Sequence, residues 1–293
     1  MTGSGNFPTI GFIGTGLMGL PMAQRLIKHD ISVVAYNRTA EKLDPLKSDG
    51  ATIAESVADL LQQAPVVLLM LTNAEAIRDT ILSEAAGAKL AGHTVIQMST
   101  IAPSESRELQ KQVNALGGEY LEAPVLGSIP QVEAGSLQVM LGGTPEQFQQ
   151  WQSLLQYFGT VQRIGEVGAA SALKLALNQL IGALTTAFAL SVGFVQRQGG
   201  DVETFMRILR ESALYAPTFD KKLDRMLDRN FADPNFPTKH LLKDMTLFLQ
   251  EASKVGLQVD SLEGVRKILE AACDAGLADA DYSALFAAVS PES

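Results

Sequence analysis

The stretch Thr9-Ile10-Gly11-Phe12-Ile13-Gly14-Thr15-Gly16-Leu17-Met18-Gly19 joins an apolar run to a Gly-x-Gly-x-x-Gly element, and residues 17–28 then carry apolar side chains at helical spacing. A strand that turns through three glycines into a helix is typical of a dinucleotide-binding domain, because the free N–H groups at the helix start face the pyrophosphate. The alternative is a glycine-rich turn without a ligand. The element predicts a cofactor site at Gly14, Gly16, Leu17, Met18 and Gly19.

The end of the next predicted strand indicates which dinucleotide is bound. Residues 31–36 are apolar and β-prone, and they run into Asn37-Arg38-Thr39. A site that prefers NAD usually has an acidic residue here, which accepts hydrogen bonds from the ribose hydroxyls. This chain instead offers the cationic fork of Arg38, which suits a 2′-phosphate, with Asn37 and Thr39 as additional donors. We therefore predict NADP(H) as the cofactor; the alternative is a solvated loop arginine.

The composition argues against two classes of partner. The chain has 293 residues, with 23 basic against 32 acidic side chains and a net charge of −9. Nucleic acids and anionic membranes need a basic face, so we expect neither as the main partner. The single cysteine, Cys273, cannot form an internal disulfide, which favours a reducing cytoplasm. Residues 1–8 lack the cationic start and apolar core of a signal peptide, and we expect a disordered leader there.

One stretch imitates a membrane span. Residues 175–196 contain no charged side chain and are about as long as a helix that crosses a bilayer. Polar residues such as Asn178, Thr185 and Thr186 interrupt the stretch, and the sequence has no other such segment. We expect a helix that is buried between domains rather than a membrane span.

The pattern of the chain changes near residue 165. Up to that point apolar runs alternate with helical patterns, which predicts a parallel sheet covered by helices, and beyond it only helical patterns remain. We predict an α/β Rossmann-type NADP-binding domain over residues 1–165 and an all-α substrate and oligomerisation domain over residues 166–293, joined by a long interdomain helix. The predicted strands cover 10–13, 31–36, 66–71, 94–98, 120–123, 137–141 and 161–164, and the predicted helices cover 17–28, 77–90, 104–116, 145–158, 170–198, 202–211, 219–227, 241–255 and 261–275.

Three further segments carry candidate functional side chains. Residues 121–128 follow a strand end and turn through Pro and Gly, which is where parallel sheets bind ligands; a plain turn is the alternative. Lys174 and Asn178 are four residues apart and share one face of the long helix, although a lysine at a helix end can simply reach solvent. Lys243 and its neighbour Asp244 lie near the start of a later helix, where the two charges can pair locally or remain solvated.

These segments together resemble the β-hydroxyacid dehydrogenase family, which includes 3-hydroxyisobutyrate dehydrogenase, tartronate semialdehyde reductase and the glyoxylate/succinic semialdehyde reductases. The resemblance runs from Thr9 to the C-terminus and covers five motifs in order. They are residues 11–19, Met98-Ser99-Thr100, residues 122–128, residues 165–178 and Lys243-Asp244. Asn37-Arg38-Thr39, residues 236–240 and residues 276–283 look most like the NADPH-dependent glyoxylate/succinic semialdehyde reductases.

The resemblance implies a reaction and a role for each motif. Hydride transfer to a small aldehyde acid leaves an alkoxide, which Lys174 would protonate while Asn178 holds the substrate oxygen or orients the lysine. The family's cofactor contacts fall on Leu71, Thr100 and Lys243 in addition to the glycine element. Its substrate site falls on Lys174, Asn178 and the loop residues Glu122, Pro124, Val125, Leu126, Gly127 and Ser128. The family also implies a homodimer or homotetramer built through the C-terminal helices.

The substrate loop departs from the family pattern at one position. The family has Pro-Val-Ser-Gly, and its serine helps to bind the substrate carboxylate, whereas this chain has Pro124-Val125-Leu126-Gly127. Leu126 cannot donate a hydrogen bond, so either backbone amides and Ser128 take over or the substrate is less polar. An imine or a bulkier carbonyl is therefore an alternative substrate. A non-catalytic NADP-binding scaffold is a further alternative, but such relatives typically lose the lysine that is present here as Lys174.

Overall fold

The structure, a computed structural model, describes residues 7–291 and consists of two compact units that divide after Lys174. Residues 1–6 and 292–293 lie outside the described part, and with them most of the expected leader. Gly165, where we placed the domain boundary, is the last residue of a strand in the first unit. The turn that follows Gly165 and the first residues of the long helix also belong to the first unit.

A sheet of nine strands forms the centre of the first unit: β1(Ile10–Ile13), β2(Val33–Tyr36), β3(Thr52–Ile53), β4(Val66–Leu69), β5(Thr94–Gln97), β6(Glu119–Glu122), β7(Val125–Leu126), β8(Leu137–Gly142) and β9(Gly159–Gly165). Six strands run parallel in the order β3-β2-β1-β4-β5-β6. β8 continues the sheet antiparallel to β6 and pairs with β7 and β9. Ligands of such sheets bind where the strand order reverses, which here is the carboxyl ends of β1 and β4.

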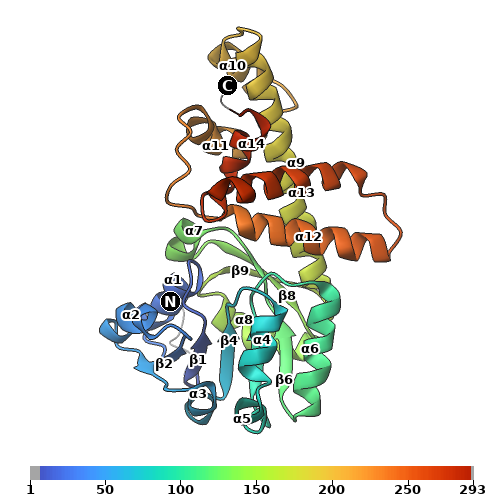
Figure 1. The fold of residues 1–293 in the computed structure, drawn as a ribbon. Helices are drawn as coiled ribbons and strands as arrows, with labels where there is room; N and C mark the ends of the chain where they lie inside the picture. Colours follow the sequence, from blue (N-terminus) through green and yellow to red (C-terminus); the bar gives the residue numbers. More distant parts are fainter. Residues whose placement is uncertain (1–6, 292–293) are drawn as a thin grey trace. The chain divides into compact units, whose positions relative to one another are not determined.

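Helices cover both faces of this sheet, as Figure 1 shows. They are α1(Gly19–Lys28), η1(Ala40–Leu43), α2(Asp44–Ser48), α3(Val57–Gln63), α4(Ala74–Ile81), α5(Glu84–Gly87), α6(Pro103–Ala115), α7(Ile129–Ala134) and α8(Pro145–Leu155). One face packs on α1, α2 and α8 around a core that includes Leu26 and Leu154. The other face packs on α3 to α6 around a core that includes Leu60 and Leu109. Both faces of the sheet are therefore buried, as the apolar strand sequences require.

One predicted helix is wrong. The periodicity predicts a single helix over residues 77–90, but the structure contains two helices, α4 and α5, which are separated at Leu82 and Ser83. The Ser83 hydroxyl donates a hydrogen bond to the Thr80 carbonyl oxygen at 3.2 Å. Such a local side-chain bond competes with the helical backbone ladder and favours a break.

The second unit is helical. It contains the greater part of α9(Ala169–Arg197), followed by α10(Val202–Arg210), α11(Pro217–Leu227), α12(Thr238–Lys254), α13(Asp260–Ala272), the π-helical turn η2(Cys273–Leu277), η3(Tyr282–Ala284) and α14(Leu285–Val289). Phe188 of α9 stacks on Phe219 of α11 with the ring centroids 4.6 Å apart. Lys222 of α11 forms a buried ion pair with Asp281 at 2.7 Å. Residues 166–291 contain no strand, so the predicted change from α/β to all-α structure is confirmed.

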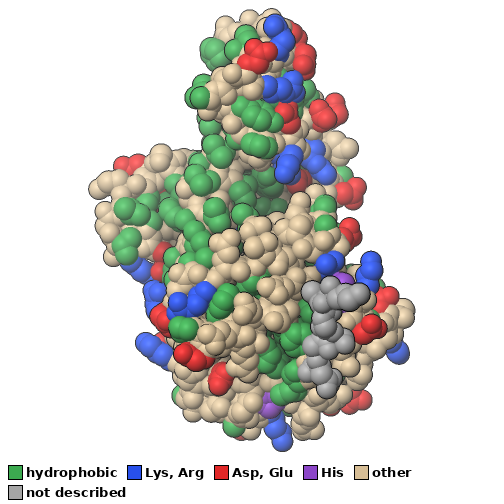
Figure 2. All heavy atoms as spheres, turned by 180° about the vertical axis from the view of Figure 1, so that it is seen from behind, with side chains coloured by type: hydrophobic (Ala, Val, Ile, Leu, Met, Phe, Trp, Pro, Cys, Tyr) green, Lys and Arg blue, Asp and Glu red, His purple; other side chains and the backbone are tan. Residues whose placement is uncertain are grey.

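The helix α9 has a buried and an exposed side. By length and composition alone it could cross a membrane, but its buried residues include the polar Asn178 and Thr186. Figure 2 shows hydrophobic side chains gathered over the helical unit. At 100° per residue, four exposed apolar side chains of α9 fall within about a third of a helical turn. This α9 stripe consists of Leu180, Leu184, Leu190 and Phe194.

Candidate active site

The glycine element leaves no room for side chains at two positions and ample room at the third. Gly14 has φ +97°, and a Cβ there would lie 2.3 Å from the Met70 carbonyl oxygen. A Cβ on Gly19 would lie 1.9 Å from the Gly14 carbonyl oxygen, which shows how closely α1 approaches the loop. A Cβ on Gly16 would meet nothing within 4 Å. The backbone at Gly16 is therefore open to a ligand, as a dinucleotide-binding loop requires.

The start of α1 suits an anion. Met18 occupies the N-cap position without a side-chain hydrogen bond, and the first turn contains no acidic residue. Leu17 beside it is 44% exposed. Backbone N–H groups at such a start carry partial positive charge, so the residues present fit a bound pyrophosphate.

The end of β2 provides a free cation. The Asn37 side chain accepts a hydrogen bond from the Thr15 N–H at 3.2 Å and donates one to the Thr39 carbonyl oxygen at 2.9 Å. Asn37 therefore ties β2 to the glycine loop in addition to any contact with a ligand. Arg38 is exposed, and its side chain forms no ion pair or hydrogen bond with any residue of the described range 7–291. Its guanidinium is available to a phosphate.

A hydrogen bond joins the segments that follow the carboxyl ends of β4 and β5. The Leu71 N–H donates a hydrogen bond to Ser99 Oγ at 2.7 Å, and a Leu71 methyl would lie 2.9 Å from a Cβ on Gly14. Leu71 thus follows β4, one of the two strands that flank the reversal of strand order, and Thr100 follows the neighbouring strand β5. A cofactor is expected at that reversal. The sequence predicts no separate role for Ser99, which is marked only as a hydroxyl residue directly after a buried strand.

Glu122 holds the start of α9. It is fully buried, and its Oε1 accepts hydrogen bonds from the backbone N–H groups of Gly168 at 2.7 Å, Ala170 at 2.9 Å and Ser171 at 3.1 Å. Its Oε2 accepts hydrogen bonds from the hydroxyls of Ser106 and Ser171, each at 2.5 Å. We predicted a substrate contact for Glu122, but both carboxylate oxygens are occupied by the protein. In this structure Glu122 anchors a helix, and its contact with a substrate stays a prediction.

The remaining substrate loop is more ordered than a plain turn. Residues Val125 and Leu126 form β7, in which Leu126 lies opposite Gln138 of β8. Both the N–H and the hydroxyl of Ser128 donate to Gln131 Oε1, at 2.9 Å and 2.8 Å, as part of the cap of α7. Both donors of Ser128 therefore already have an acceptor, and the alternative in which Ser128 and backbone amides take over from the missing loop serine stays a prediction. Leu126 is half-buried and follows Pro124 and Val125 into Gly127, which has φ +133°.

Lys174 lies one turn beyond the anchored helix start. It is 8% exposed and is the last residue of the first unit. Ala170 and Ser171, which bond to Glu122, precede it by four and three residues and so lie on the same side of α9. Lys174 and Asn178 also share a face of this helix, as their spacing predicts.

In the second unit, Asn178 contacts a carboxylate. Its Nδ2 donates a hydrogen bond to Asp244 Oδ2 at 2.6 Å, and Lys243 Nζ lies 3.1 Å from Asp244 Oδ1. The local pairing of Lys243 with Asp244 is thus present, while the bond between Asp244 and Asn178 could not be read from the sequence. Burial, reinforced by the cations Lys243 and Lys239, lowers the pKa of His240 in the same helix.

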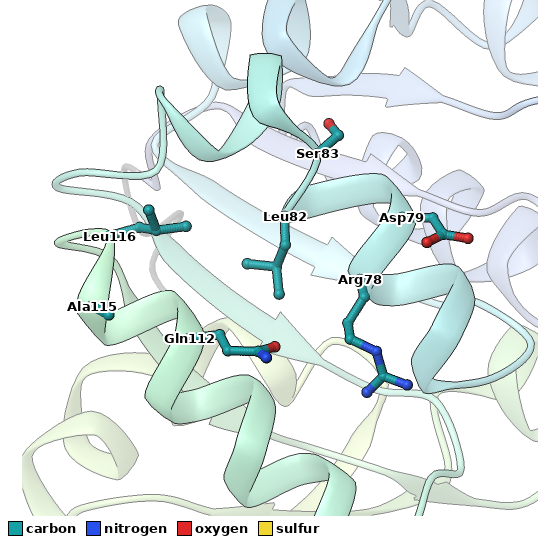
Figure 3. Close-up of a pocket in the computed structure, with 7 residues that line it drawn as sticks. All are labelled: Arg78, Asp79, Leu82, Ser83, Gln112, Ala115 and Leu116. Carbon is teal, nitrogen blue, oxygen red and sulfur yellow. The ribbon is translucent and has the colours of Figure 1, made fainter.

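A shallow hollow of about 670 Å³ lies between α4 and α6. Figure 3 shows its lining side chains, of which Leu82, Ala115 and Leu116 are apolar. None of its residues belongs to the predicted cofactor or substrate site. The lining residues are Arg78, Asp79, Leu82, Ser83, Gln112, Ala115 and Leu116.

The chain matches known families over nearly its whole length. Residues 9–168 match the NAD binding domain of 6-phosphogluconate dehydrogenase. Residues 168–289 match the NAD-binding region of NADP-dependent 3-hydroxyisobutyrate dehydrogenase. Glyoxylate/succinic semialdehyde reductase 2, chloroplastic, of Arabidopsis thaliana is 31% identical over 96% of this chain and 79% of its own length. The 2-hydroxy-3-oxopropionate reductase of Escherichia coli (strain K12) is 29% identical over 96% of both chains.

Solved structures share the fold. The 3-hydroxyisobutyrate dehydrogenase of Mycobacterium tuberculosis, solved with L-serine, has a TM-score of 0.86 at 22% identity and covers 96% of this chain and 98% of its own. An imine reductase from Myxococcus stipitatus in complex with NADP⁺ has a TM-score of 0.66 at 20% identity and covers 95% of this chain and 98% of its own. At these identities the likeness shows the fold alone. The family matches, together with the glycine element, show that this chain belongs to the β-hydroxyacid dehydrogenase family and is an NAD(P)-dependent oxidoreductase.

Proposed function

We propose that this chain reduces a small aldehyde acid, such as glyoxylate or succinic semialdehyde, to the hydroxy acid with NADPH, and that Lys174 supplies the proton. The observation that carries the proposal is the placement of Lys174, which is only 8% exposed and lies one turn beyond a helix start held by a buried carboxylate. The names of the two reductases that resemble this chain support the substrate class.

The proposed chemistry needs a proton donor. Reduction of an aldehyde leaves negative charge on its oxygen, and a positioned acid lowers the barrier by giving up a proton as that charge forms. When bound, the nicotinamide supplies the hydride. Lys174 would hold the proton on Nζ and donate it to the forming alkoxide. Asn178, whose amide is bonded to Asp244, would hold the substrate oxygen or orient the lysine.

We assign the cofactor to the glycine loop, to Arg38, Leu71 and Thr100, and to Lys243. The loop from Gly14 to Gly19 and the start of α1 would bind the pyrophosphate, and Leu71 and Thr100 would contact the nicotinamide side together with Lys243. The exposed guanidinium of Arg38 supports NADPH over NADH, because it suits a 2′-phosphate and no acidic residue stands in its place.

A second candidate substrate is an imine or a bulkier carbonyl. Leu126 favours it, because the loop offers no hydroxyl at this position and the Ser128 hydroxyl is bonded to Gln131. The fold is shared with an imine reductase solved with NADP⁺.

The experiment that tests the proposed function measures NADPH consumption with a panel of carbonyl substrates. The panel contains glyoxylate, succinic semialdehyde, methylmalonate semialdehyde, tartronate semialdehyde and cyclic imines. We expect turnover of one or more aldehyde acids. Turnover of cyclic imines alone would support the second candidate. NADPH binding, measured by fluorescence titration, without turnover on the whole panel would contradict the proposal and favour a scaffold.

We also infer that the chain forms a homodimer or homotetramer through the α9 stripe. Leu180, Leu184, Leu190 and Phe194 are between 38% and 67% exposed, and contiguous apolar patches on a soluble protein mark association sites. Phe194→Asp should shift the particle mass measured by light scattering toward the monomer, whereas the control Val255→Asp, at another exposed apolar position, should not. A monomeric wild-type protein would contradict the inference.

A further inference from the structure

Glu122 is a buried carboxylate that is stabilised by hydrogen bonds rather than by an ion pair. It lies at the end of β6 and accepts three backbone N–H and two hydroxyl hydrogen bonds, and no Lys or Arg side chain of residues 7–291 forms an ion pair with it. Three of its donors are the backbone N–H groups at the start of α9. A carboxylate at such a position is stabilised both by the hydrogen bonds and by the helix dipole. The arrangement fastens the start of α9 to the end of β6.

Neighbouring residues lie close around the Glu122 side chain and leave it little room to move. A Cβ on Gly142, which lies opposite Glu122 in β8, would be 2.5 Å from Glu122 Oε1. Gly168, which donates to the same oxygen, has φ +99°, and a Cβ there would lie 2.1 Å from an Arg107 guanidinium nitrogen. The two glycines allow the carboxylate and the chain turn to approach each other. The position of the helix start is therefore tightly defined.

The anchor is close to Lys174 along the helix. Ala170 and Ser171 precede Lys174 by four and three residues, which corresponds to a rise of about 4.5–6 Å along an α-helix. A shift of the helix start is passed to Lys174 because the backbone between them is one hydrogen-bonded turn.

We propose that Glu122 is a positioning residue for Lys174: its carboxylate sets the place of the α9 start and thereby the place of the proton donor. This rests on the proposed function, in which Lys174 acts as the acid. Glu122 itself touches no reacting atom, because both of its oxygens are taken up by protein donors. Its loss should therefore lower kcat and leave KM and the Kd for NADPH nearly unchanged. A misplacement of about 1 Å costs up to about 100-fold in rate.

Two serines provide a matched comparison with mild substitutions. Ser171 and Ser106 each donate a hydroxyl hydrogen bond of 2.5 Å to Glu122 Oε2, but only Ser171 belongs to α9. We expect Ser171→Ala to lower kcat several-fold more than Ser106→Ala, with KM and the Kd for NADPH unchanged in both. Equal effects on kcat, or an effect confined to KM, would overturn the proposal.

Larger changes at Glu122 extend the test. Glu122→Ala should lower kcat by about 100-fold. Glu122→Gln should keep most of the wild-type kcat, because the amide oxygen can accept the three N–H bonds and the amide NH2 can donate to both serine hydroxyls. The control Asp201→Ala removes a carboxylate that caps α10, far along the chain, and should leave kcat unchanged. A Glu122→Gln protein as slow as Glu122→Ala would overturn the proposal.

A double-mutant cycle separates this proposal from the proposed function. In a Lys174→Ala background, Glu122→Ala should lower the residual rate by less than about twofold, because the side chain it positions is absent. A further loss as large as in the wild-type background would show that Glu122 acts elsewhere. If the Lys174→Ala protein retained most of the wild-type kcat, the proposed function would be contradicted, whatever the two serine variants showed.

Discussion

The side-chain amide of Asn178 donates a hydrogen bond to Asp244 at 2.6 Å, although 66 positions separate the two residues in the chain. Both side chains are almost fully buried, and Lys243 pairs with the second Asp244 oxygen. A buried amide must find partners, so this bond determines which way the Asn178 side chain faces. Asp244 thereby orients one of the residues assigned to the substrate site.

Removing that carboxylate should destabilise the helical unit. Asp244→Ala leaves the buried Asn178 amide without this acceptor, and we expect the free energy of unfolding to fall by about 1–3 kcal/mol. Asp244→Asn keeps an acceptor and should lose less. Urea denaturation measures both. The control is Asp279→Ala, whose carboxylate is exposed and pairs with Lys239, so the loss of stability there should be smaller than for Asp244→Ala. Equal stability of Asp244→Ala and wild type would contradict the assignment.

The local part of the site could be predicted from the sequence, and the part made by distant residues could not. The glycine element sets its own backbone geometry within a few residues, so Gly14, Gly16 and Gly19 lie as expected. Arg38 follows directly from the end of the next strand. Both predictions rest on contiguous segments, for which spacing is sufficient evidence.

Glu122 shows why the contacts between distant residues could not be predicted from the sequence. Its donors come from residues up to 49 positions away, and no pattern in the sequence links residue 122 to the start of α9. The resemblance placed Glu122 in a substrate loop because the motif is contiguous there. The structure instead shows that the loop begins after Glu122, whose side chain turns to the helix.

Lys174→Ala should lower kcat by about 10²–10⁴-fold, which is the usual contribution of a positioned acid. The Kd for NADPH should change little, because the lysine acts on the carbonyl oxygen and not on the pyrophosphate. Steady-state kinetics and fluorescence titration measure the two quantities. Lys239→Ala is the control, since this lysine is half-exposed and pairs with the exposed Asp279. Retention of more than about a tenth of the wild-type kcat would show that the proton comes from another group.

Arg38→Asp should narrow or reverse the preference for NADPH over NADH. The substitution removes the cation that suits a 2′-phosphate and supplies a carboxylate that accepts hydrogen bonds from the ribose hydroxyls. The ratio of kcat/KM for the two cofactors is the measurement. Lys111→Asp makes the same charge change at an exposed lysine of α6 and should leave the ratio unchanged. A preference of the unmodified protein for NADH would contradict the assignment of NADP(H).

His240 should make the stability depend on pH near neutrality. Burial first, and then the cations Lys243 and Lys239, lower the pKa of His240 below its usual 6.5. Between the folded pKa and 6.5 the unfolded chain binds the proton and the folded chain does not, so stability rises with pH across this window. The free energy of unfolding should therefore decrease as the pH is lowered from about 7.5 to about 5.5, and it should decrease less in the His240→Gln protein. Identical pH dependence of the two proteins would refute the role of His240.

Leu126→Ser should restore the donor that the family loop has at this position. A hydrogen bond to a charged acceptor contributes about 1.5–3 kcal/mol, which corresponds to a KM for glyoxylate that is about 10- to 100-fold lower. An apolar substrate that packs on the leucine should lose up to about 1.5–3 kcal/mol from the same change. The Ser128 hydroxyl should not mask the effect, because it is bonded to Gln131.

Opposite responses of the two substrate classes would identify residue 126 as a determinant of specificity. The matched control is Leu116→Ser, which makes the same substitution at a leucine that is 41% exposed and lines the hollow between α4 and α6. It should leave both KM values unchanged, because that hollow shares no residue with the predicted substrate site. If Leu126→Ser also leaves both KM values unchanged, the side chain points away from the substrate and the substrate carboxylate is bound by other groups.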